Sequence, residues 1–385
     1  MLDLKSKLIT KVKSLKGKRV LLRLDFNVPI NEAGEIEETF RIDSIIPTIQ
    51  YFVDKEAKVI IVSHIGSDGK QSLAPIDTYL SKRFNTAFFP DLDNLFHIEN
   101  LKNGEVGILE NIRRADGEMT NNPKIAKELA NLADIYVNEA FSVSHREQSS
   151  IVGIPKYLPS YIGPLFLKEY ENLAQAFLPK HPFLFILGGI KFQTKIPLIK
   201  NFIKKADQIF VGGALSNSFY KKLGYEIGKS LADSDLSSMT EFLQAKNVFL
   251  PLDVVTEVHG DVFVRQPEKV KSKETIVDVG PDTVDKLKKQ IKEAKFILWN
   301  GPLGNFEKGF NRGTLEIARA IASSHALSIV GGGDTVSAIS DLKLEKEFGF
   351  VSTAGGAMLD FLANGTLPGI EAILKSKIKM KTLKK

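Results

Sequence analysis

The sequence predicts an α/β fold of two doubly wound lobes, each built on a mainly parallel sheet and joined by a connecting helix and hinge. Short β-branched runs alternate with amphipathic segments of helical period along almost the whole chain, which is the pattern of βαβ units. The length of 385 residues exceeds what one hydrophobic core usually supports. Because these units fall into two series, we expect one lobe from 1–172 and a second from 173–366.

The first series contains strand-like and helical segments in alternation. Strands are expected where aliphatic and β-branched residues follow one another, and helices where apolar residues recur every three or four positions. The expected strands are 19–26, 58–64, 105–110 and 134–138, and the expected helices are 43–55 and 123–133. The segment 163–182 opens after a Gly-Pro pair and closes at prolines, which suits a helical connector between the lobes.

The second series is marked by strands that end in glycine. These strands are expected at 182–189, 208–213, 296–301 and 327–333. In open α/β sheets, ligands collect beyond the carboxyl ends of the strands, where glycines allow close backbone approach and helix N-termini attract anions. A single glycine pair would indicate only a tight turn. Four such strand ends together predict a phosphate-rich ligand and an enzyme that moves a phosphoryl group.

The positive charge of the chain is concentrated at its end. The formal net charge is +6, and residues 375–385 alone contain six lysines and no acid. The rest of the chain is therefore neutral, without the basic footprint of a nucleic-acid-binding protein. We expect no nucleic-acid partner, and we expect the C-terminal segment 367–385, with its lysine-rich tail, to pack back on the first lobe.

The composition also excludes several kinds of site. The chain has no cysteine, which rules out a disulfide framework and a cysteine nucleophile and fits a reducing compartment, so we expect a cytoplasmic protein. The six histidines have no zinc-ligand spacing. No apolar run approaches the roughly 18 residues that a membrane span needs, and we expect no membrane association.

Two familiar kinase motifs are missing. The segment Gly224–Gly228 has three residues between its glycines where a P-loop has four, so we interpret it as a structural loop. His145-Arg146-Glu147 lacks the aspartate of a protein-kinase catalytic loop. Any phosphoryl transfer must therefore use another scaffold.

Charged side chains follow the glycines of the second series. Lys191 and Lys195 are four residues apart, so on an opening helix both would face one anion, although a solvated lysine face is the alternative. Asp334 directly follows Gly331–Gly333. It could cap the next helix or bind Mg²⁺, the metal that phosphoryl transfer commonly uses.

The strand ends of the first series carry polar groups of another kind. Three of them are arginines, whose planar guanidinium groups match carboxylate and phosphate oxygens. Surface ion pairing remains the alternative for each arginine, and a satisfied buried histidine is the alternative for His64. The residues concerned are Asp25, Asn27, Arg41, His64, Arg113 and Arg146.

Eight segments, in this order along the chain, resemble the phosphoglycerate kinase family from about residue 5 to residue 370. The resemblance implies a monomeric, two-lobed, hinge-bending enzyme. Its reaction would transfer phosphate between 1,3-bisphosphoglycerate and MgADP to give 3-phosphoglycerate and MgATP. The segments are LLRLDFNVP (21–29), KVIIVSHIG (58–66), ADIYVNEAF (133–141), LGGIKFQTKI (187–196), GYEIGKS (224–230), LWNGPLGNFE (298–307), GGGDT (331–335) and STAGGAMLDFLANGTLPG (352–369).

The resemblance also assigns residues by motif position. Arg41 would be the catalytic arginine, Asp334 would hold Mg²⁺, and Lys191 with the N–H groups of Gly355 and Gly356 would stabilise the moving phosphoryl group. The first lobe would bind the acid through Asp25, Phe26, Asn27, Arg41, His64, Ile65, Gly66, Ser67, Arg113 and Arg146. The second would bind ATP or ADP through Lys195, Gly280, Glu307, Gly332, Gly333, Asp334 and Thr335.

The sequence departs from the family pattern at two positions. Ser67 stands where the family usually has an arginine that contacts the phosphate of the acid, and the loop that follows is shorter. Loss of this contact would weaken binding of the acid unless Lys70 or Arg114 compensates. Ala354 replaces a usual glycine before Gly355-Gly356. Two alternatives therefore stay open: a kinase of the same mechanism that acts on another small carboxylic acid, and a nucleotide-binding relative without catalytic activity.

Overall fold

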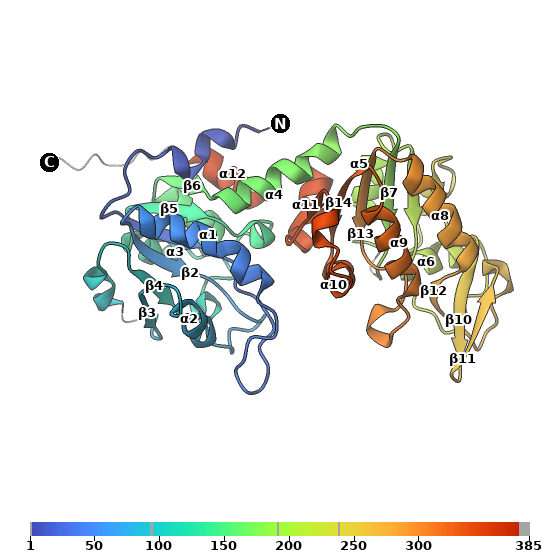
Figure 1. The fold of residues 1–385 in the computed structure, drawn as a ribbon, viewed down its shortest axis with the longest axis horizontal. Coiled ribbons are helices and arrows are strands. Elements are labelled where there is room, and N and C mark those ends of the chain that lie inside the picture. The colour runs from blue at the N-terminus through green and yellow to red at the C-terminus, as the bar shows by residue number, and fades with distance from the viewer. Residues whose placement is uncertain (1, 93–94, 191, 238, 377–385) are drawn as a thin grey trace. The chain divides into compact units, whose positions relative to one another are not determined.

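A computed structural model of the chain describes residues 2–92, 95–190, 192–237 and 239–376, which form two compact units (Figure 1). One unit comprises the chain up to Glu171 together with the segment from Thr366, and the other is Asn172–Gly365. The boundary falls within helix α4 (Pro164–Ala174), which is followed by the short turn η8 (Gln175–Phe177). The connector expected as one helix over 163–182 is therefore shorter than predicted.

The first unit is built on a six-stranded sheet in the order β3-β4-β2-β1-β5-β6. All paired neighbours in this sheet are parallel, and Val20 lies between Val59 and Ile135. The strands are β1 (Arg19–Arg23), β2 (Lys58–Val62), β3 (Thr86–Phe89), β4 (Val106–Leu109), β5 (Ile135–Asn138) and β6 (Ser160–Ile162).

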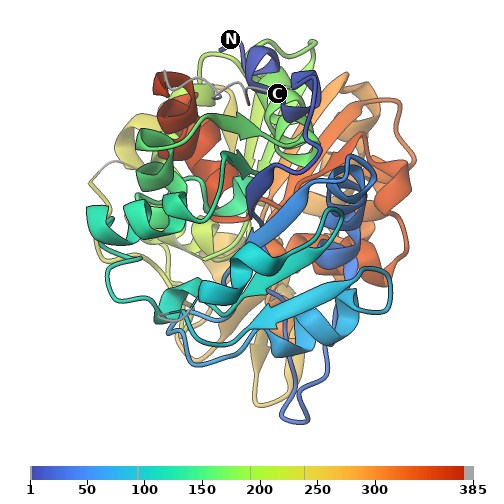
Figure 2. The same ribbon diagram turned by 90° about the vertical axis from the view of Figure 1, so that its left-hand side faces the viewer.

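Helices cover both faces of this sheet, as Figures 1 and 2 show. Leu22 packs in one hydrophobic cluster with residues of α1 (Phe40–Asp54) and α2 (Ala74–Leu80), and its neighbour Leu21 packs in another with residues of α3 (Pro123–Asn131). Successive strand residues point to opposite faces, so a strand covered on both sides is apolar throughout. This explains the unbroken apolar runs of the sequence.

Short turns and one late helix complete the first unit. Helix α12 (Pro368–Lys375) contacts the turn η6, and the amide of Gly369 donates a 2.9 Å hydrogen bond to the carbonyl of Ser144. The last part of the predicted lysine-rich tail, 377–385, lies outside the described residues. The turns are η1 (Lys5–Lys7), η2 (Ile9–Lys11), η3 (Phe96–Asn100), η4 (Ile112–Arg114), η5 (Phe141–Val143), η6 (Ser149–Gly153) and η7 (Ile154–Lys156).

The second unit contains another parallel six-stranded sheet, in the order β15-β14-β13-β7-β8-β9. Ile186 and Trp299 pack on one face with residues of α8 (Pro281–Glu293) and α9 (Arg312–Ala322). Phe183 and Phe185 contact Phe202, the last residue of α5 (Ile196–Phe202), through their rings. Its strands are β7 (Phe183–Leu187), β8 (Gln208–Val211), β9 (Val248–Phe249), β13 (Phe296–Asn300), β14 (Leu327–Gly331) and β15 (Phe350–Val351).

The helices of the second unit alternate with these strands. They are α5 (Ile196–Phe202), α6 (Ala214–Lys222), α7 (Met239–Leu243), α8 (Pro281–Glu293), α9 (Arg312–Ala322), α10 (Gly333–Asp341) and α11 (Gly356–Asn364). Short turns lie at η9 (Pro267–Lys269), η10 (Phe306–Lys308) and η11 (Glu345–Glu347).

A three-stranded antiparallel sheet, which the sequence interpretation did not include, is also part of the second unit. Its order is β11-β10-β12, from β10 (Val254–Val258), β11 (Asp261–Arg265) and β12 (Thr275–Val279). His259 and Gly260 join the first two strands with φ angles of 53° and 90°, as a two-residue hairpin turn requires.

The predicted fold class is confirmed, because both large sheets are parallel and carry helices on their two faces. Within the residues described above, no helix is long and apolar enough to cross a membrane.

Candidate functional site

The sheet order of the first unit brings the predicted acid-binding residues to one edge. Strands β4, β2, β1 and β5 are neighbours, and parallel strands present their carboxyl ends on the same side. Asp25 and Asn27 follow β1, His64 follows β2, Arg113 follows β4, and Arg146 follows β5. Segments far apart in the sequence therefore supply one cluster of polar side chains.

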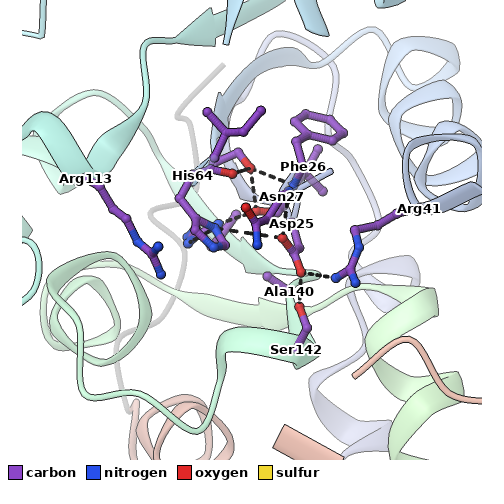
Figure 3. A network of polar contacts seen from close by, with 12 residues as sticks. Asp25, Phe26, Asn27, Arg41, His64, Arg113, Ala140 and Ser142 are labelled. Carbon is purple, nitrogen blue, oxygen red and sulfur yellow. Dashed lines mark hydrogen bonds and ion pairs between the residues drawn. The ribbon is translucent and has the colours of Figure 1, made fainter. Parts of the chain in front are cut away.

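Asp25 is the centre of this cluster (Figure 3). Its Oδ2 accepts hydrogen bonds from Arg41 and from the hydroxyl of Ser142, and its Oδ1 accepts one of 3.0 Å from the amide of Asn27. Burial alone would raise the pKa of Asp25, but Arg41 and then His64 lower it, to about 2. Asp25 is thus ionised at neutral pH and orients the Arg41 guanidinium at the start of α1.

His64 is buried beside two charged groups. Its Nδ1 lies 3.4 Å from Nη2 of Arg23 and 3.9 Å from Oδ1 of Asp25. Burial and the Arg23 charge lower the pKa of His64 to about 3. The imidazole is therefore neutral, and a bond from Arg23 to Nδ1 leaves the proton on Nε2, which can donate to an anion.

Arg113 holds donors that are still free to bind a ligand. One of its nitrogens, Nη1, donates to the carbonyl of Gly66, but Nε and Nη2 are buried and meet no acceptor within the described residues. Burial and the charges of Arg146 and Arg23 lower the pKa of Arg113, so positive groups crowd here. Unsatisfied buried donors are costly, and a bound carboxylate or phosphate would satisfy them.

Arg23 is a member of the cluster that sequence reasoning missed. It ends β1, is fully buried, and donates to Ser150 Oγ at 3.0 Å and to the carbonyl of Leu24. Burial lowers the pKa of Arg23, and the carboxylate of Glu118, which is also buried, opposes that shift. The signal was available, because an arginine inside an apolar strand is almost never buried without a partner.

Phe26 and Ile65 reach the cluster only through their backbones. Both side chains are fully buried in the core between the sheet and α1. The amide of Phe26 donates to Ser63 Oγ at 2.9 Å. Gly66 links the two strand ends, because its amide donates to Asn27 Oδ1 at 2.9 Å.

The loop after β2 is held by Arg114, which was a candidate to compensate for Ser67. Arg114 donates to the carbonyls of Gly69 and Lys70, both at 3.0 Å, and to Glu110 at 2.8 Å. Lys70 is exposed and pairs with Asp68. Ser67 is exposed on the same loop. The Arg114 donors thus bind the loop itself, whereas two donors of Arg113 have no acceptor within the described residues.

A cavity of about 500 Å³ lies in the second unit, beyond strand ends β7, β8 and β13. Of the predicted nucleotide-binding residues, it is lined by Glu307 and Asp334. Most of its wall is apolar, which is typical of sites that bind small molecules. The remaining lining includes Gly189, Ile190, Gly213, Ala214, Asn217, Lys229, Leu231, Pro251, Val254, Ile276, Val277, Asp278, Pro302, Leu303 and Phe306.

Three helices near this region begin at glycines that leave their first amides open. α6, α10 and α11 start after Gly213, Gly332 and Gly355, whose φ angles are 61°, 105° and 54°. None of these glycines has a side chain that could cap the helix. The second amides of α6 and α11 already donate to the carbonyls of Gly189 and Ala354, which leaves the amides of the first helical residues to bind an anion. Gly333 and Gly356 are the first helical residues of α10 and α11. Thr335, in the first turn of α10, has a buried hydroxyl without a partner in the described chain.

Lys195 lies just before α5 rather than on an exposed helix face. It is buried, and its Nζ donates to Oδ1 of Asn300 at the end of β13. Burial lowers the pKa of Lys195 to about 8. The solvated-lysine alternative is therefore wrong for this residue. Lys191, its predicted companion, lies outside the described residues.

Gly280, a predicted nucleotide-binding residue, lies between β12, which lines the cavity, and the start of α8. It is the residue before α8, it does not line the cavity, and a Cβ there would overlap the carboxylate of Asp253. Asp253 accepts from the amides of Asp282 and Thr283 and so fixes the start of α8. The packing at the start of α8 therefore requires a glycine here, and Ile276–Val279, directly before it, line the cavity.

Two lining residues had no sequence signal that we used. Asn217 donates from Nδ2 to the carbonyl of Leu231 at 3.1 Å, and its Oδ1 is buried without a partner in the described part of the chain. Lys229 belongs to the segment that was excluded as a P-loop, which follows helix α6, and it is one of the residues that line the cavity.

Comparison with known proteins places this geometry in a family. A sequence model of the family "Phosphoglycerate kinase" matches residues 9–365. The phosphoglycerate kinase of Dictyoglomus turgidum is 43% identical over 94% of this chain and 97% of its own. The chain belongs to the phosphoglycerate kinase family. The phosphoglycerate kinase of Aquifex aeolicus is 40% identical over 92% of this chain and 95% of its own.

Solved structures agree with the sequence relatives. Phosphoglycerate kinase from Coxiella burnetii has a TM-score of 0.84 at 38% identity, covering 96% of this chain and 99% of the other. The enzyme from Pyrococcus horikoshii OT3 has a TM-score of 0.81 at 29% identity, covering 94% and 97%. The protein is thus a phosphotransferase of glycolysis. It converts 1,3-bisphosphoglycerate and ADP into 3-phosphoglycerate and ATP, and it also catalyses the reverse reaction. Neither alternative considered from the sequence is favoured.

Proposed function

We propose that the first unit binds 3-phosphoglycerate and the second binds the nucleotide, and that each does so with the clusters described above. The observation that supports the acid site best is Arg113, whose two buried donors have no acceptor in the described chain. Arg113, Arg146 and neutral His64 bind the oxygens of the acid, and Asn27 and Ser67 border it. Arg23 is fully buried and supports the cluster through its contact with His64.

The nucleotide occupies the cavity of the second unit. Its base and ribose lie against the apolar wall and Glu307, and its phosphates extend toward Lys195 and the start of α10 at Gly332 and Gly333. Thr335 supports this assignment, because its unpartnered hydroxyl could bond to a phosphate oxygen.

Asp334 is the residue that we assign to Mg²⁺. It is exposed, in the first turn of α10, and on the cavity wall. No group of three or more histidine or acidic side chains in the described residues could hold a metal without help. This fits Mg²⁺, which commonly takes one or two carboxylates together with waters and substrate phosphates. When bound, Mg²⁺ neutralises phosphate charge.

In the direction of ATP consumption, a carboxylate oxygen of 3-phosphoglycerate forms a bond to the γ-phosphorus while the bond to the ADP oxygen breaks. The protein contributes mainly position and charge, as in other phosphoryl transfers. Arg41, Lys191 and the amides of Gly355 and Gly356 stabilise the negative charge on the moving group. Closure of the units, with α4 among the segments that bend, excludes water that would hydrolyse the acyl phosphate.

One chain carries both clusters, so we propose that a monomer is sufficient for catalysis. The place of the reaction in glycolysis makes the cytoplasm the compartment that we propose.

A coupled assay tests the substrate assignment. The purified protein should consume ATP in the presence of 3-phosphoglycerate and Mg²⁺, and it should do so poorly with small carboxylic acids that lack the phosphate. Glycerate serves as the matched comparison, since it differs only by that group. Equal kcat/KM values for glycerate and 3-phosphoglycerate would contradict a phosphate-binding role for the Arg113 cluster.

The pH dependence of nucleotide binding tests the role of Lys195. Because its pKa is about 8, the ammonium is charged below that pH and loses its proton above it. We expect the Kd for MgADP to rise above pH 8, by at most about tenfold per pH unit. Calorimetric titration between pH 7 and 9 measures this. Lys195→Met should bind weakly at every pH, so parallel pH curves for the two proteins would contradict the assignment.

A further inference from the structure

A buried carboxylate outside the acid cluster joins three elements of the first unit. Glu139 directly follows β5 and is 3% exposed. Its Oε1 accepts from the Thr48 hydroxyl at 2.5 Å and from the Leu165 amide at 3.0 Å, and its Oε2 accepts from the Phe166 amide at 2.9 Å. Thr48 lies in α1, and both amides lie in the first turn of α4.

The contact with α4 is a helix cap supplied from a distant strand. The two amides that Glu139 binds are among those that an α-helix leaves without internal partners at its start. Gly163, the residue before α4, fits closely against Glu139, and a Cβ there would overlap the carboxylate. The start of α4 is therefore fixed to the end of β5.

The contact with α1 concerns the helix that carries Arg41. Thr48 follows Arg41 by seven residues, which is about two helical turns. Three residues after Glu139, Ser142 donates to Asp25, the carboxylate that binds Arg41. The segment from Glu139 to Ser142 is therefore connected to α1 at two points. Glu139 binds Thr48 directly, and Ser142 binds Asp25, which in turn binds Arg41.

Capping alone does not explain this arrangement. Burial raises the pKa of Glu139 to about 7, even though Thr48 and the two amides oppose the shift. Within the described residues Glu139 has no ion pair, since its partners there are the Thr48 hydroxyl and the two amides. Such burial is costly, whereas a serine or aspartate next to the helix would cap α4 at the surface. The Thr48 bond in particular adds nothing to the cap.

We propose that Glu139 is a positioning residue that ties the start of α4 to α1, so that the orientation of α4 sets the position of Arg41. The inference rests on the proposed catalytic role of Arg41. Since α4 contains the boundary between the two units, bending there would be transmitted to Arg41 through Glu139 and Thr48. Loss of the hydrogen bond between Glu139 and Thr48 should therefore alter turnover without altering the binding of either substrate.

The test removes the hydrogen bond from Thr48 to Glu139 and leaves the bonds from α4 to Glu139 in place. Thr48→Val deletes the hydroxyl at nearly constant volume while the α4 cap stays intact, and Thr48→Ser keeps the hydroxyl. We expect Thr48→Val to lower kcat by about tenfold, because small misplacements of a catalytic group are costly, with the KM for 3-phosphoglycerate and the Kd for MgADP within about twofold. Thr48→Ser should keep wild-type kcat. Steady-state kinetics, calorimetry and thermal melting measure these quantities.

Three results would overturn the proposal: wild-type kcat in Thr48→Val, equal loss in both variants, or a rise in KM at unchanged kcat. Glu139→Gln gives an independent check, since an amide nitrogen cannot accept the Phe166 N–H, and its loss of kcat should be at least as large. Failure of the Arg41 assignment would look different. In that case Arg41→Ala would remain active, whatever the Thr48 variants did.

Discussion

Arg41→Ala is expected to lower kcat by about 100- to 1,000-fold, the usual cost of removing a donor that stabilises transition-state charge. The guanidinium is partly exposed, with 28% of its side chain accessible, and Asp25 holds it at the edge where the acid binds. The Kd for MgADP should be nearly unchanged, because the nucleotide cavity is built from residues of the other unit. Steady-state kinetics and calorimetry measure the two effects separately.

Two variants make this experiment specific. Arg83→Ala removes another arginine of the same unit, whose exposed ion pair with Asp43 spans 3.4 Å, and surface pairs of this kind contribute only about 0–1 kcal/mol. It should keep wild-type kinetics. Arg41→Lys keeps the charge but loses the planar fork, so it should recover only part of the activity. If Arg41→Ala kept more than about a tenth of wild-type turnover, its catalytic role would be excluded, since one lost donor costs more.

Part of the polar cluster in the first unit could be predicted from the sequence. The polar residues that end predicted strands, such as Asp25 and His64, could be placed together because parallel strands share one edge. Arg23 was missed although its position inside an apolar run predicts burial with a partner. Its particular partners, Ser150 and Glu118, could not be predicted, because they are far away in the sequence. Glu139 was missed for a similar reason, because its partners at Thr48 and α4 are far away in the sequence. Long-range hydrogen bonds of buried groups leave no periodic signal.

In the second unit, the positions of glycines in the sequence did not predict the role of each glycine. Glycines at strand ends predicted a phosphate-rich ligand, but each glycine has its own structural reason. Gly332 and Gly355 open helices with positive φ, whereas Gly280 makes room for the carboxylate of Asp253. The sequence alone did not separate these cases. It also gave no indication that the antiparallel sheet around β12 would supply part of the cavity wall through Ile276–Val279.

Asp278 lies in the cavity wall, and its burial is another feature that the sequence does not predict. It is buried, and burial raises its pKa to about 6, although the amides of Gly313 and Val279 oppose the shift. Its two carboxylate oxygens accept those amides at 2.9 and 2.8 Å. The residue fixes the start of α9 beside the cavity, and nothing in its sequence neighbourhood distinguishes it from an exposed aspartate.

Asp334→Asn should have the second large effect, on the use of Mg²⁺. The amide oxygen is a much weaker ligand than a carboxylate, and a catalytic metal supplies several kcal/mol, so we expect kcat/KM for MgATP to fall by about 100-fold at 1 mM Mg²⁺. Binding of ADP without Mg²⁺ should instead be unchanged or tighter. The substitution removes a negative charge from the first turn of α10, where the phosphates are proposed to bind.

These opposite effects separate a metal-binding role from a helix cap. Loss of a cap would weaken nucleotide binding with and without Mg²⁺ alike, and it would lower the melting temperature. Asp341→Asn, at the other end of the same helix, is the matched control and should leave both titrations unchanged. Calorimetry with ADP and MgADP, together with kcat measured against Mg²⁺ concentration, gives the comparison. A variant that binds free ADP and MgADP as the wild type does would show that Asp334 does not hold the metal.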